Sequence, residues 1–279
     1  MEGFPILKSR LIALDIDGTI LDKPSGLDVP VEVRDAVKEA RESGVRVCIS
    51  SSRPCFFVQD ALDGLGEVDA LIGCSGASIA ITNGSSVDEA GSIKYQFNDN
   101  LSMEIIQTCI EVSKEWNTHA SFGGREKILA RKIGDVEPKF SLDPLFSFMN
   151  DDELLSALSG EPVSCAYFFT KEGLPDEALE KVRGITDATV HSSGNGSFTI
   201  TNKGTDKGSG LLYLAKHWGI PIEATLAVGN DENDIPMITA AGVGVAVGNA
   251  SPETLAAADW IAPDVWEAGA AVAIRRFAL

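Results

Sequence analysis

The chain has 279 residues, 44% of them hydrophobic, and carries a formal net charge of -18. This length exceeds the usual size of one domain, so we expect one large α/β domain or a core that carries a second domain. The negative charge repels nucleic-acid phosphates and anionic membranes, so neither is expected as a partner. A small phosphorylated metabolite remains compatible with this charge, because a bound cation or one lysine reverses the potential locally.

The cysteines and the N-terminus indicate a reducing compartment. The five cysteines form an odd count without a CxxC or other metal-ligand spacing: Cys48, Cys55, Cys74, Cys109 and Cys165. The N-terminus lacks a signal-peptide pattern, and no apolar run is long enough to span a bilayer. The sequence therefore predicts a cytoplasmic protein.

Strand and helix patterns alternate from the first apolar run. Apolar runs over 11–16, 46–51 and 70–74 predict buried strands of a parallel sheet. Between the first two runs, apolar residues at helical spacing predict a helix over 30–41, which begins at a proline and ends before Gly44. This order is that of a strand, helix and parallel strand unit.

The same alternation returns towards the C-terminus. Helices are predicted over 207–218 and 235–241, and strands over 225–228, 243–247 and 260–261. The fold class we expect is α/β, with a doubly wound, Rossmann-like parallel sheet. In such a sheet the ligand binds beyond the carboxyl ends of the strands.

The middle of the chain has a different pattern. Strand-like pieces lie near 92–97, 166–170 and 197–201, with amphipathic helices near 101–116 and 175–183. We therefore expect a core formed by residues 1–82 and 203–279, with an inserted α+β cap domain over residues 83–202.

Two aspartates follow the first predicted strand, in the stretch LDIDGT. Positions i and i+2 at a strand end point the same way, so Asp15 and Asp17 are expected to crowd one site. Such a pair is costly unless a cation or a shared proton relieves it, and a magnesium ion relieves it well. One carboxylate could then act as an ionised nucleophile and the other as a general acid. The alternative is an acidic turn without a function.

A serine-rich loop, CISSSRP, follows the second predicted strand. The backbone N–H groups from Ser51 to Arg53 lead into a helix expected to start at Pro54, an arrangement typical of an anion site. The alternative is a loop that only caps a helix.

The stretch DIDGTILD resembles the DxDGT(L/I)xD opening motif of the haloacid dehalogenase-like (HAD) hydrolases. The whole chain resembles their Cof-type subclass, in which an α/β cap is inserted between the second and third motifs. The likeness runs from Leu11 to the C-terminus in the core and thins to element order in the cap. It implies a magnesium-dependent phosphatase that works through an aspartyl-phosphate. By motif position, Asp15 would be the nucleophile, and Asp17 would protonate the leaving oxygen and later activate water.

The resemblance assigns roles to two further motifs. Ser51 takes the position of the hydroxyl that holds the phosphoryl group, and Ser52 stands where the family usually has glycine. Together with Arg53, these residues form the expected phosphate-binding loop. The stretch NKGTDKGSGL resembles KGxxKGxAL, which makes Lys207, rather than Lys203, the lysine that neutralises the nucleophile and the phosphoryl oxygens.

The fourth motif, VGNDENDIPM, resembles GDxxNDxxM, with Asn230 in place of a metal-binding aspartate. An asparagine offers magnesium a carbonyl oxygen without a charge, so we expect weaker metal binding unless Asp231 compensates. Asn233 is implied to contact the substrate phosphate or the cap, and Asp234 to orient Lys207 or metal-bound water. The implied Mg²⁺ site therefore comprises Asp15, Asp17, Asn230, Asp231 and Asp234.

Other stretches either extend or depart from this resemblance. In CSGAS, Ser75 replaces the asparagine of the family's NGA, whereas GVGVAVGNASPETLAAADW is close to GVxVAxGNAxxxxKxxAD. The glycines of the latter do not fit GxGxxG, which argues against a dinucleotide site. In the expected cap, residues 123–125 (GGR) form either a plain turn or a loop that reaches the substrate.

The sequence thus predicts a phosphatase that hydrolyses a small phosphomonoester, a sugar phosphate or a related metabolite. A phosphomutase or phosphotransferase that uses the same aspartate is an alternative. A low-turnover, phosphate-binding regulatory protein is another, because Ser52, Ser75 and Asn230 depart from the family pattern. Asp15, Asp17 and Lys207 argue against that reading. The physiological substrate and the oligomeric state stay open.

Overall fold

The computed structural model describes residues 8–22, 29–82, 94–133, 145–169, 175–185, 187–192 and 197–279. The chain forms two compact units, Met1–Gln96 with Asp206–Leu279, and Phe97–Thr205. The sequence-based boundary at residue 83 lies outside the described residues. In the part of the chain that the structure describes, no helix is both long and apolar enough to cross a membrane.

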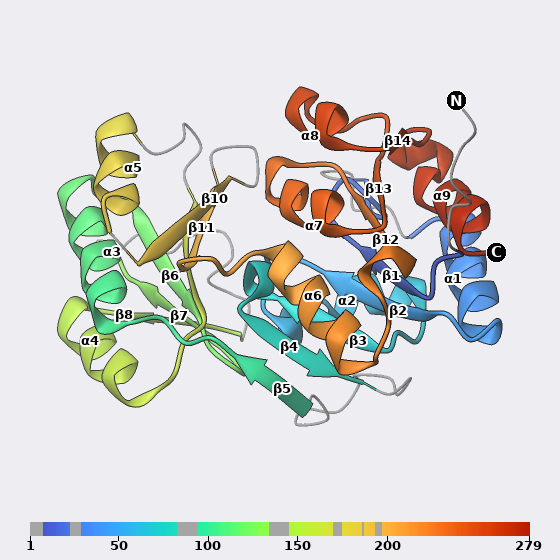
Figure 1. The fold of residues 1–279 in the computed structure, drawn as a ribbon. Helices are drawn as coiled ribbons and strands as arrows, with labels where there is room; N and C mark the ends of the chain where they lie inside the picture. The colour runs from blue at the N-terminus through green and yellow to red at the C-terminus, as the bar shows by residue number, and fades with distance from the viewer. Residues whose placement is uncertain are drawn as a thin grey trace. The chain divides into compact units, whose positions relative to one another are not determined.

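An eight-stranded sheet forms the centre of the first unit (Figure 1). Its strand order is β14-β13-β12-β1-β2-β3-β4-β5, and the strands from β14 to β3 run parallel, whereas β4 is antiparallel to β3. The doubly wound parallel sheet is therefore confirmed. Its strands are β1 (Leu11–Leu14), β2 (Arg46–Ser50), β3 (Ala70–Gly73), β4 (Ser78–Ile81), β5 (Lys94–Asn98), β12 (Thr225–Gly229), β13 (Val243–Ala246) and β14 (Trp260–Ile261).

Helices cover both faces of this sheet, because alternate strand residues point to opposite sides. Ile12 and Leu14 of β1 pack into the cluster that also contains the apolar residues of α1, α2 and α9. Leu11 and Ala13 pack into a second cluster with residues of α6 and α7. The helices of this unit are α1 (Val31–Glu42), α2 (Gln59–Leu65), α6 (Lys207–His217), α7 (Ile235–Ala240), α8 (Pro252–Ala257) and α9 (Gly269–Phe277).

The second unit is an α+β structure built on a six-stranded sheet of order β10-β11-β9-β6-β7-β8. Every neighbouring pair is antiparallel except β7 and β8. Phe122 of β6 and Phe168 of β9 are buried in a cluster with apolar residues of the three helices. The elements are α3 (Met103–Glu115), β6 (His119–Gly123), β7 (Ile128–Arg131), β8 (Phe146–Met149), α4 (Asp151–Gly160), β9 (Cys165–Phe169), α5 (Asp176–Arg183), β10 (Ala188–Ser192) and β11 (Ser197–Asn202).

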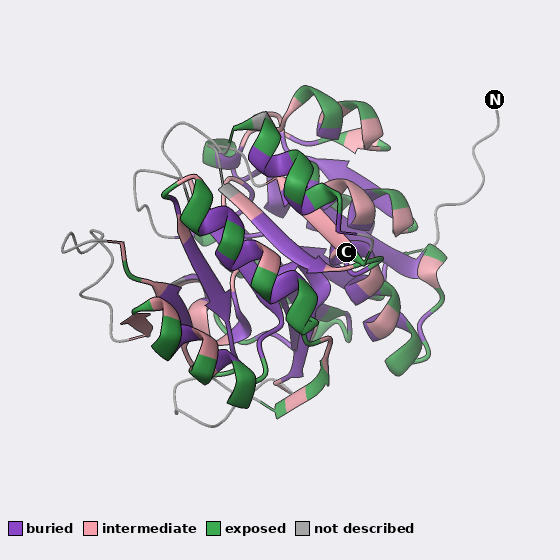
Figure 2. Cartoon of the chain, turned by 90° about the vertical axis from the view of Figure 1, so that its left-hand side faces the viewer, coloured by how far each residue is buried: buried purple, intermediate pink, exposed green. Residues whose placement is uncertain are grey.

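The burial of the strands and helices explains why the hydrophobic pattern of the sequence predicted them. Figure 2 shows strands buried along much of their length and helices on which buried and exposed residues form separate stripes.

One expectation was wrong: the strand predicted over 92–97 among the cap pieces is β5, which joins the eight-stranded sheet beside β4. It lies at the edge of that sheet, and each of its residues is exposed or half-buried, so its pattern differs from that of the buried central strands. Residues 123–125 lie at the turn between β6 and β7, where the Gly124 N–H donates to the Lys127 carbonyl oxygen.

Candidate active site

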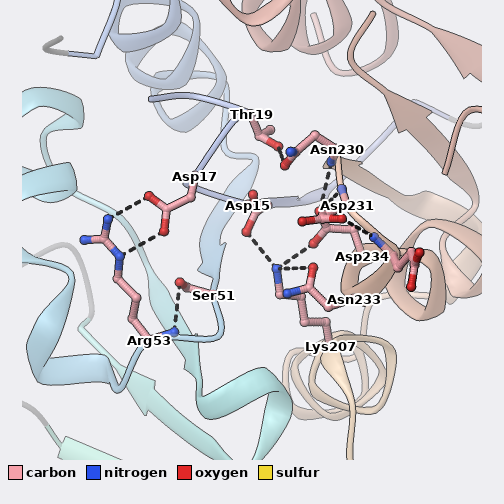
Figure 3. Close-up of polar contacts among 11 residues, drawn as sticks. Asp15, Asp17, Thr19, Ser51, Arg53, Lys207, Asn230, Asp231, Asn233 and Asp234 are labelled. Atoms are coloured by element: carbon pink, nitrogen blue, oxygen red, sulfur yellow. Dashed lines mark hydrogen bonds and ion pairs between the residues drawn. The ribbon is translucent and has the colours of Figure 1, made fainter. Parts of the chain in front are cut away.

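Three neighbouring strands deliver the predicted residues to one edge of the sheet (Figure 3). Asp15 follows β1, Ser51 follows β2 and Asn230 follows β12. The Asp15 N–H still donates to the Val228 carbonyl oxygen at 3.0 Å, which fixes the start of the loop against β12. Polar groups therefore gather beyond the carboxyl ends of the strands beside β1, where doubly wound sheets bind ligands.

Lys207 lies at the centre of this group. Its Nζ donates to Asp15 Oδ1 at 2.7 Å and to Asp234 Oδ1 at 2.5 Å, and it lies 3.5 Å from Asn233 Oδ1. The lysine is 1% exposed, so these contacts are formed away from solvent. By contrast, the alternative Lys203 is exposed. The structure thus places Lys207, and not Lys203, beside the expected nucleophile.

The start of α6 explains how a charged side chain is buried there. Lys207 is the first residue of the helix, and the preceding Asp206 caps it by accepting from the Ser209 N–H at 2.7 Å. A Cβ on Gly208 would lie 2.5 Å from the Pro236 carbonyl oxygen, and one on Gly76 would collide with the backbone oxygen of Asp206. The glycines therefore let the helix start approach its neighbours closely enough to place Lys207 in the site.

Gly76→Ala is expected to destabilise the protein far more than Gly44→Ala. Both glycines have a positive φ, 103° and 84°, but nothing lies within 4 Å of a Cβ on Gly44. Gly44→Ala should therefore cost only the left-handed strain of about 1–2 kcal/mol. Gly76→Ala adds a backbone clash of about 1–3 kcal/mol. Urea unfolding of both variants measures the difference, and equal losses would contradict the close approach of α6.

Asp234 organises the loop after β12. Its Oδ1 accepts from Lys207, while its Oδ2 accepts from the backbone N–H groups of Asn230 at 2.9 Å and Asp231 at 3.1 Å. The Asp231 carboxylate is also engaged, because its Oδ1 accepts from the Glu232 N–H at 2.9 Å. In this arrangement Asp234 orients Lys207, and both of its oxygens already have donors.

The Asp17 carboxylate binds a different cation from the one that binds Asp15. Arg53 binds it with two parallel contacts, from Nη2 to Oδ1 at 2.6 Å and from Nε to Oδ2 at 3.0 Å. The two carboxylates still interact, because the charge of Asp17 is among the causes that raise the pKa of Asp15. Asp15 points towards Lys207 and Asp17 towards Arg53 (Figure 3), and the chain turns after them at Gly18, whose φ is 87°.

The loop from Ser51 to Arg53, which the sequence predicts to bind phosphate, follows β2. The Ser51 N–H donates to the Ile72 carbonyl oxygen at 2.8 Å, and its hydroxyl accepts from the Arg53 N–H at 3.1 Å. Ser52 lies between them and is half-buried. A 3₁₀ turn, Cys55–Phe57, follows Pro54, and α2 begins only at Gln59. The loop therefore leads into α2 through a short turn.

Two residues that sequence reasoning did not single out hold the loop after β1. The Asn249 side chain donates from Nδ2 to the Gly18 carbonyl oxygen at 2.8 Å and accepts from the Val265 N–H at the same distance. The Thr19 hydroxyl lies 2.9 Å from the near end of the Asn230 amide, which is the end that also faces Asp15 and Asp17. Asn249 could have been found from the sequence, because it lies in the GNA stretch that resembles the family pattern. Thr19 could have been found only from its position in the DGT motif.

Ser75 carries strain beside the site. It has φ 50° and ψ 40°, a left-handed conformation that asparagine tolerates better than serine. Its hydroxyl is buried, and it has no hydrogen-bond partner among the described residues. A serine at this position therefore lowers the stability of the fold locally and does not improve the packing.

Burial and charge shift the acidities in the site. Burial and the nearby Asp234 raise the pKa of Asp15 to about 7, although Lys207 opposes the shift. Burial alone would lower the pKa of Lys207, but Asp15 and Asp234 raise it above its usual value. Burial also raises the pKa of Asp231. Lys207 therefore stays charged, and Asp15 needs further positive charge to be fully ionised at neutral pH.

The donor atoms around Asn230 fit magnesium. The near end of the Asn230 amide lies 3.1 Å from Asp15 Oδ2 and 3.0 Å from the Asp17 carbonyl oxygen. Adjacent ligands of an octahedral Mg²⁺ at about 2.1 Å lie about 3 Å apart, so the amide end has the right spacing from each of the two oxygens. Among the described residues, no three His, Cys, Asp or Glu side chains form a metal-binding group. The set that fits is thus mixed: a carboxylate, a backbone carbonyl and an amide.

Comparisons with known proteins agree with this geometry. Residues 12–274 match the family model of the haloacid dehalogenase-like hydrolases. The chain is 30% identical to Phosphatase YwpJ of Bacillus subtilis, over 90% of this chain and 93% of that protein. It is 29% identical to a phosphoglycolate phosphatase of Methanothermobacter thermautotrophicus, over 96% and 98% of the two chains.

Solved structures share the fold. A haloacid dehalogenase-like hydrolase from B. subtilis matches with a TM-score of 0.81 and 25% identity, over 95% of this chain and 99% of that chain. The HAD subclass IIB sugar phosphatase BT4131 also gives a TM-score of 0.81, at 22% identity, over 96% and 99%. The chain therefore belongs to the haloacid dehalogenase-like hydrolases, in their Cof-type subclass.

Proposed function

We propose that the chain is a magnesium-dependent phosphatase that hydrolyses a small phosphomonoester through an aspartyl-phosphate on Asp15. The observation that supports this most directly is the buried contact of Lys207 with both Asp15 and Asp234 at the carboxyl edge of the sheet. A purely structural ion pair has no need to lie beside a serine-rich loop and a second aspartate. The family and the phosphatases among the relatives support the reaction class.

Asp15 is the nucleophile in this mechanism. Lys207 holds Asp15 Oδ1 at 2.7 Å and leaves Oδ2 directed towards Asn230. The lysine also places a fixed positive charge where the phosphoryl oxygens gain negative charge, and in a buried site such a charge needs little reorganisation. Asp234 keeps the lysine in place by accepting from it and from two backbone N–H groups.

Asp17 is the acid and base. It protonates the leaving oxygen and afterwards takes a proton from the attacking water. Its carboxylate is 30% exposed, and the Arg53 guanidinium holds both of its oxygens. The Ser51 hydroxyl and the Asn233 amide would complete the phosphate-binding surface, with Ser52 and Arg53 in the same loop, because the N–H groups of Ser51 and Arg53 already donate to the Ile72 carbonyl oxygen and the Ser51 hydroxyl.

Asp15, the Asp17 carbonyl and Asn230 would hold Mg²⁺, with Asp231 and Asp234 beside them. The ion would supply positive charge to the phosphoryl oxygens and would favour the ionised form of Asp15. Curated relatives named for phosphoglycolate and for 5-amino-6-(5-phospho-D-ribitylamino)uracil, together with a sugar phosphatase of the same fold, support a small phosphorylated metabolite as substrate.

A phosphate-release assay tests this proposal. The protein is given an aryl phosphate and a panel of sugar phosphates and phosphoglycolate, with magnesium and then with a chelator. We expect release that depends on magnesium and is restored when the metal is returned. Transfer of the phosphoryl group to an added alcohol or sugar without phosphate release would instead identify a phosphotransferase, and no turnover of any kind would contradict catalysis.

Arg53→Gln is expected to lower kcat by roughly 10- to 100-fold, because Asp17 would lose the clamp that fixes its orientation. The loss should be smaller for an aryl phosphate, whose leaving oxygen needs no proton from Asp17. Arg34→Gln, on the exposed side of α1, is the matched control and should behave as wild type. Steady-state kinetics with both substrates measure the effect. An unchanged kcat with a raised KM would show that Arg53 serves substrate binding and not the orientation of Asp17.

A further inference from the structure

Three oxygen atoms converge on one end of the Asn230 side chain. They are Thr19 Oγ1 at 2.9 Å, the contact drawn in Figure 3, the Asp17 carbonyl oxygen at 3.0 Å and Asp15 Oδ2 at 3.1 Å. The far end of the amide packs against Gly18, where any Cβ would collide with it. The side chain is therefore held in place, and only the choice of which end faces the three oxygens remains.

The two ends of the amide give opposite interactions with these oxygens. With the amide oxygen facing them, the Thr19 hydroxyl can donate to it, but it also faces Asp15 Oδ2 and the Asp17 carbonyl without a proton between them. With the nitrogen facing them, its two N–H groups donate to the oxygens around it. Buried acceptors are costly when no donor meets them, so the nitrogen end is favoured when no cation is present.

A cation reverses this preference. Magnesium takes oxygen ligands, and an N–H group pointing at it would be repelled. The near end of the amide must then be oxygen, at the spacing from Asp15 and Asp17 that an octahedral ion requires. Aspartate at this position could never supply the N–H groups, because an ionised carboxylate only accepts.

We propose that Asn230 is a two-state residue: in the metal-free protein its amide nitrogen takes the place of the cation, and Mg²⁺ binds only when the amide turns over to present its oxygen. The inference rests on the metal site of the proposed function but not on turnover. Metal-free protein is thereby stabilised, and magnesium has to displace hydrogen bonds that an aspartate would not make. Both effects set this chain apart from relatives with aspartate there.

The test compares Asn230→Asp, Asn230→Ala and the control Asn150→Asp in the absence of substrate. Asn150 caps α4 and is exposed, and aspartate serves equally well as an N-cap, so this control adds the same charge without touching the site. Magnesium affinity is measured by calorimetry, and melting temperature is measured in chelator and in saturating magnesium.

We expect Asn230→Asp to bind magnesium at least about tenfold more tightly than wild type. In chelator it should melt at least about 2–4 °C lower, and magnesium should raise its melting temperature more than it raises that of wild type. Asn230→Ala should also melt lower in chelator, but without the gain in affinity. Asn150→Asp should match wild type in both measurements.

The proposal is overturned if, in chelator, Asn230→Asp melts at or above wild type. It is equally overturned if Asn230→Asp binds magnesium no more tightly than wild type does. Neither measurement needs a substrate, so a failure here leaves the phosphatase proposal standing, and a failure to release phosphate leaves this inference standing.

Discussion

Asp15→Asn is expected to lower kcat for every substrate by about 10⁴-fold or more, because the amide cannot attack phosphorus and the neighbouring carboxylates of the described site are held by other groups. Asp17 is held by Arg53, and Asp234 accepts from Lys207 and from two backbone N–H groups. Phosphate release measured over several hours with concentrated protein gives the size of the loss.

The fold of this variant should be retained. Asparagine has nearly the shape of aspartate, and Lys207 keeps its contact with Asp234. Asp35→Asn, on the exposed side of α1, removes the same charge and should leave kcat unchanged. If Asp15→Asn retained a tenth of the wild-type rate while melting normally, Asp15 would not be the nucleophile.

Lys207→Met is expected to lower the free energy of unfolding by about 3–5 kcal/mol, because it leaves the carboxylates of Asp15 and Asp234 buried without their cation. The control Lys203→Met removes an exposed lysine and should change stability by less than about 0.5 kcal/mol. Urea unfolding of both variants gives the difference. A loss for Lys207→Met as small as that of the control would contradict the buried ion network.

A second substitution separates the lost charge from a general packing defect. The double variant Lys207→Met with Asp234→Asn removes one of the two uncompensated carboxylates, and should recover part of the stability. A defect of packing would not be relieved in this way.

The sign of the pH dependence follows from the raised pKa of Asp15. Burial and Asp234 already raise it to about 7, and removal of Lys207 removes the opposing effect. A carboxyl whose pKa is higher in the folded state than in the unfolded state costs stability as pH rises above the unfolded value. Wild type bears the same cost up to its own raised pKa, so the extra deficit of Lys207→Met should appear above about pH 7 and be larger near pH 8 than near pH 5. A deficit that does not change with pH would contradict this cause.

The core sheet was predictable because its strands are buried on both faces. Continuous apolar runs such as 11–16 and 225–228 have no other simple explanation, and the amphipathic pattern of α1 matches its position on one face of the sheet. The small elements were harder to predict. Strands β6 and β7 are five and four residues long, and β6 mixes polar and apolar residues, so their pattern resembles that of a loop.

The residues of the site could be predicted from their motifs, but their pairings could not. Strand alternation predicted a common direction for Asp15 and Asp17, but it did not predict that they bind different cations, Lys207 and Arg53. The contact of Arg53 with Asp17 joins residues 36 positions apart, and no local pattern encodes it. The sequence did identify Asn230 as a departure, but only its distances to three oxygens show what its amide can do.

The covalent intermediate is the most direct test of the proposed mechanism. Asp17→Asn should still be phosphorylated by an aryl phosphate, whose leaving group needs no general acid, but should be slow to hydrolyse the product because no base activates water. Acid quenching with magnesium present, followed by peptide mass mapping, should then find one phosphoryl group on Asp15. A phosphoryl group on another residue, or phosphate release at the wild-type rate, would contradict an aspartyl-phosphate at Asp15 that Asp17 helps to hydrolyse.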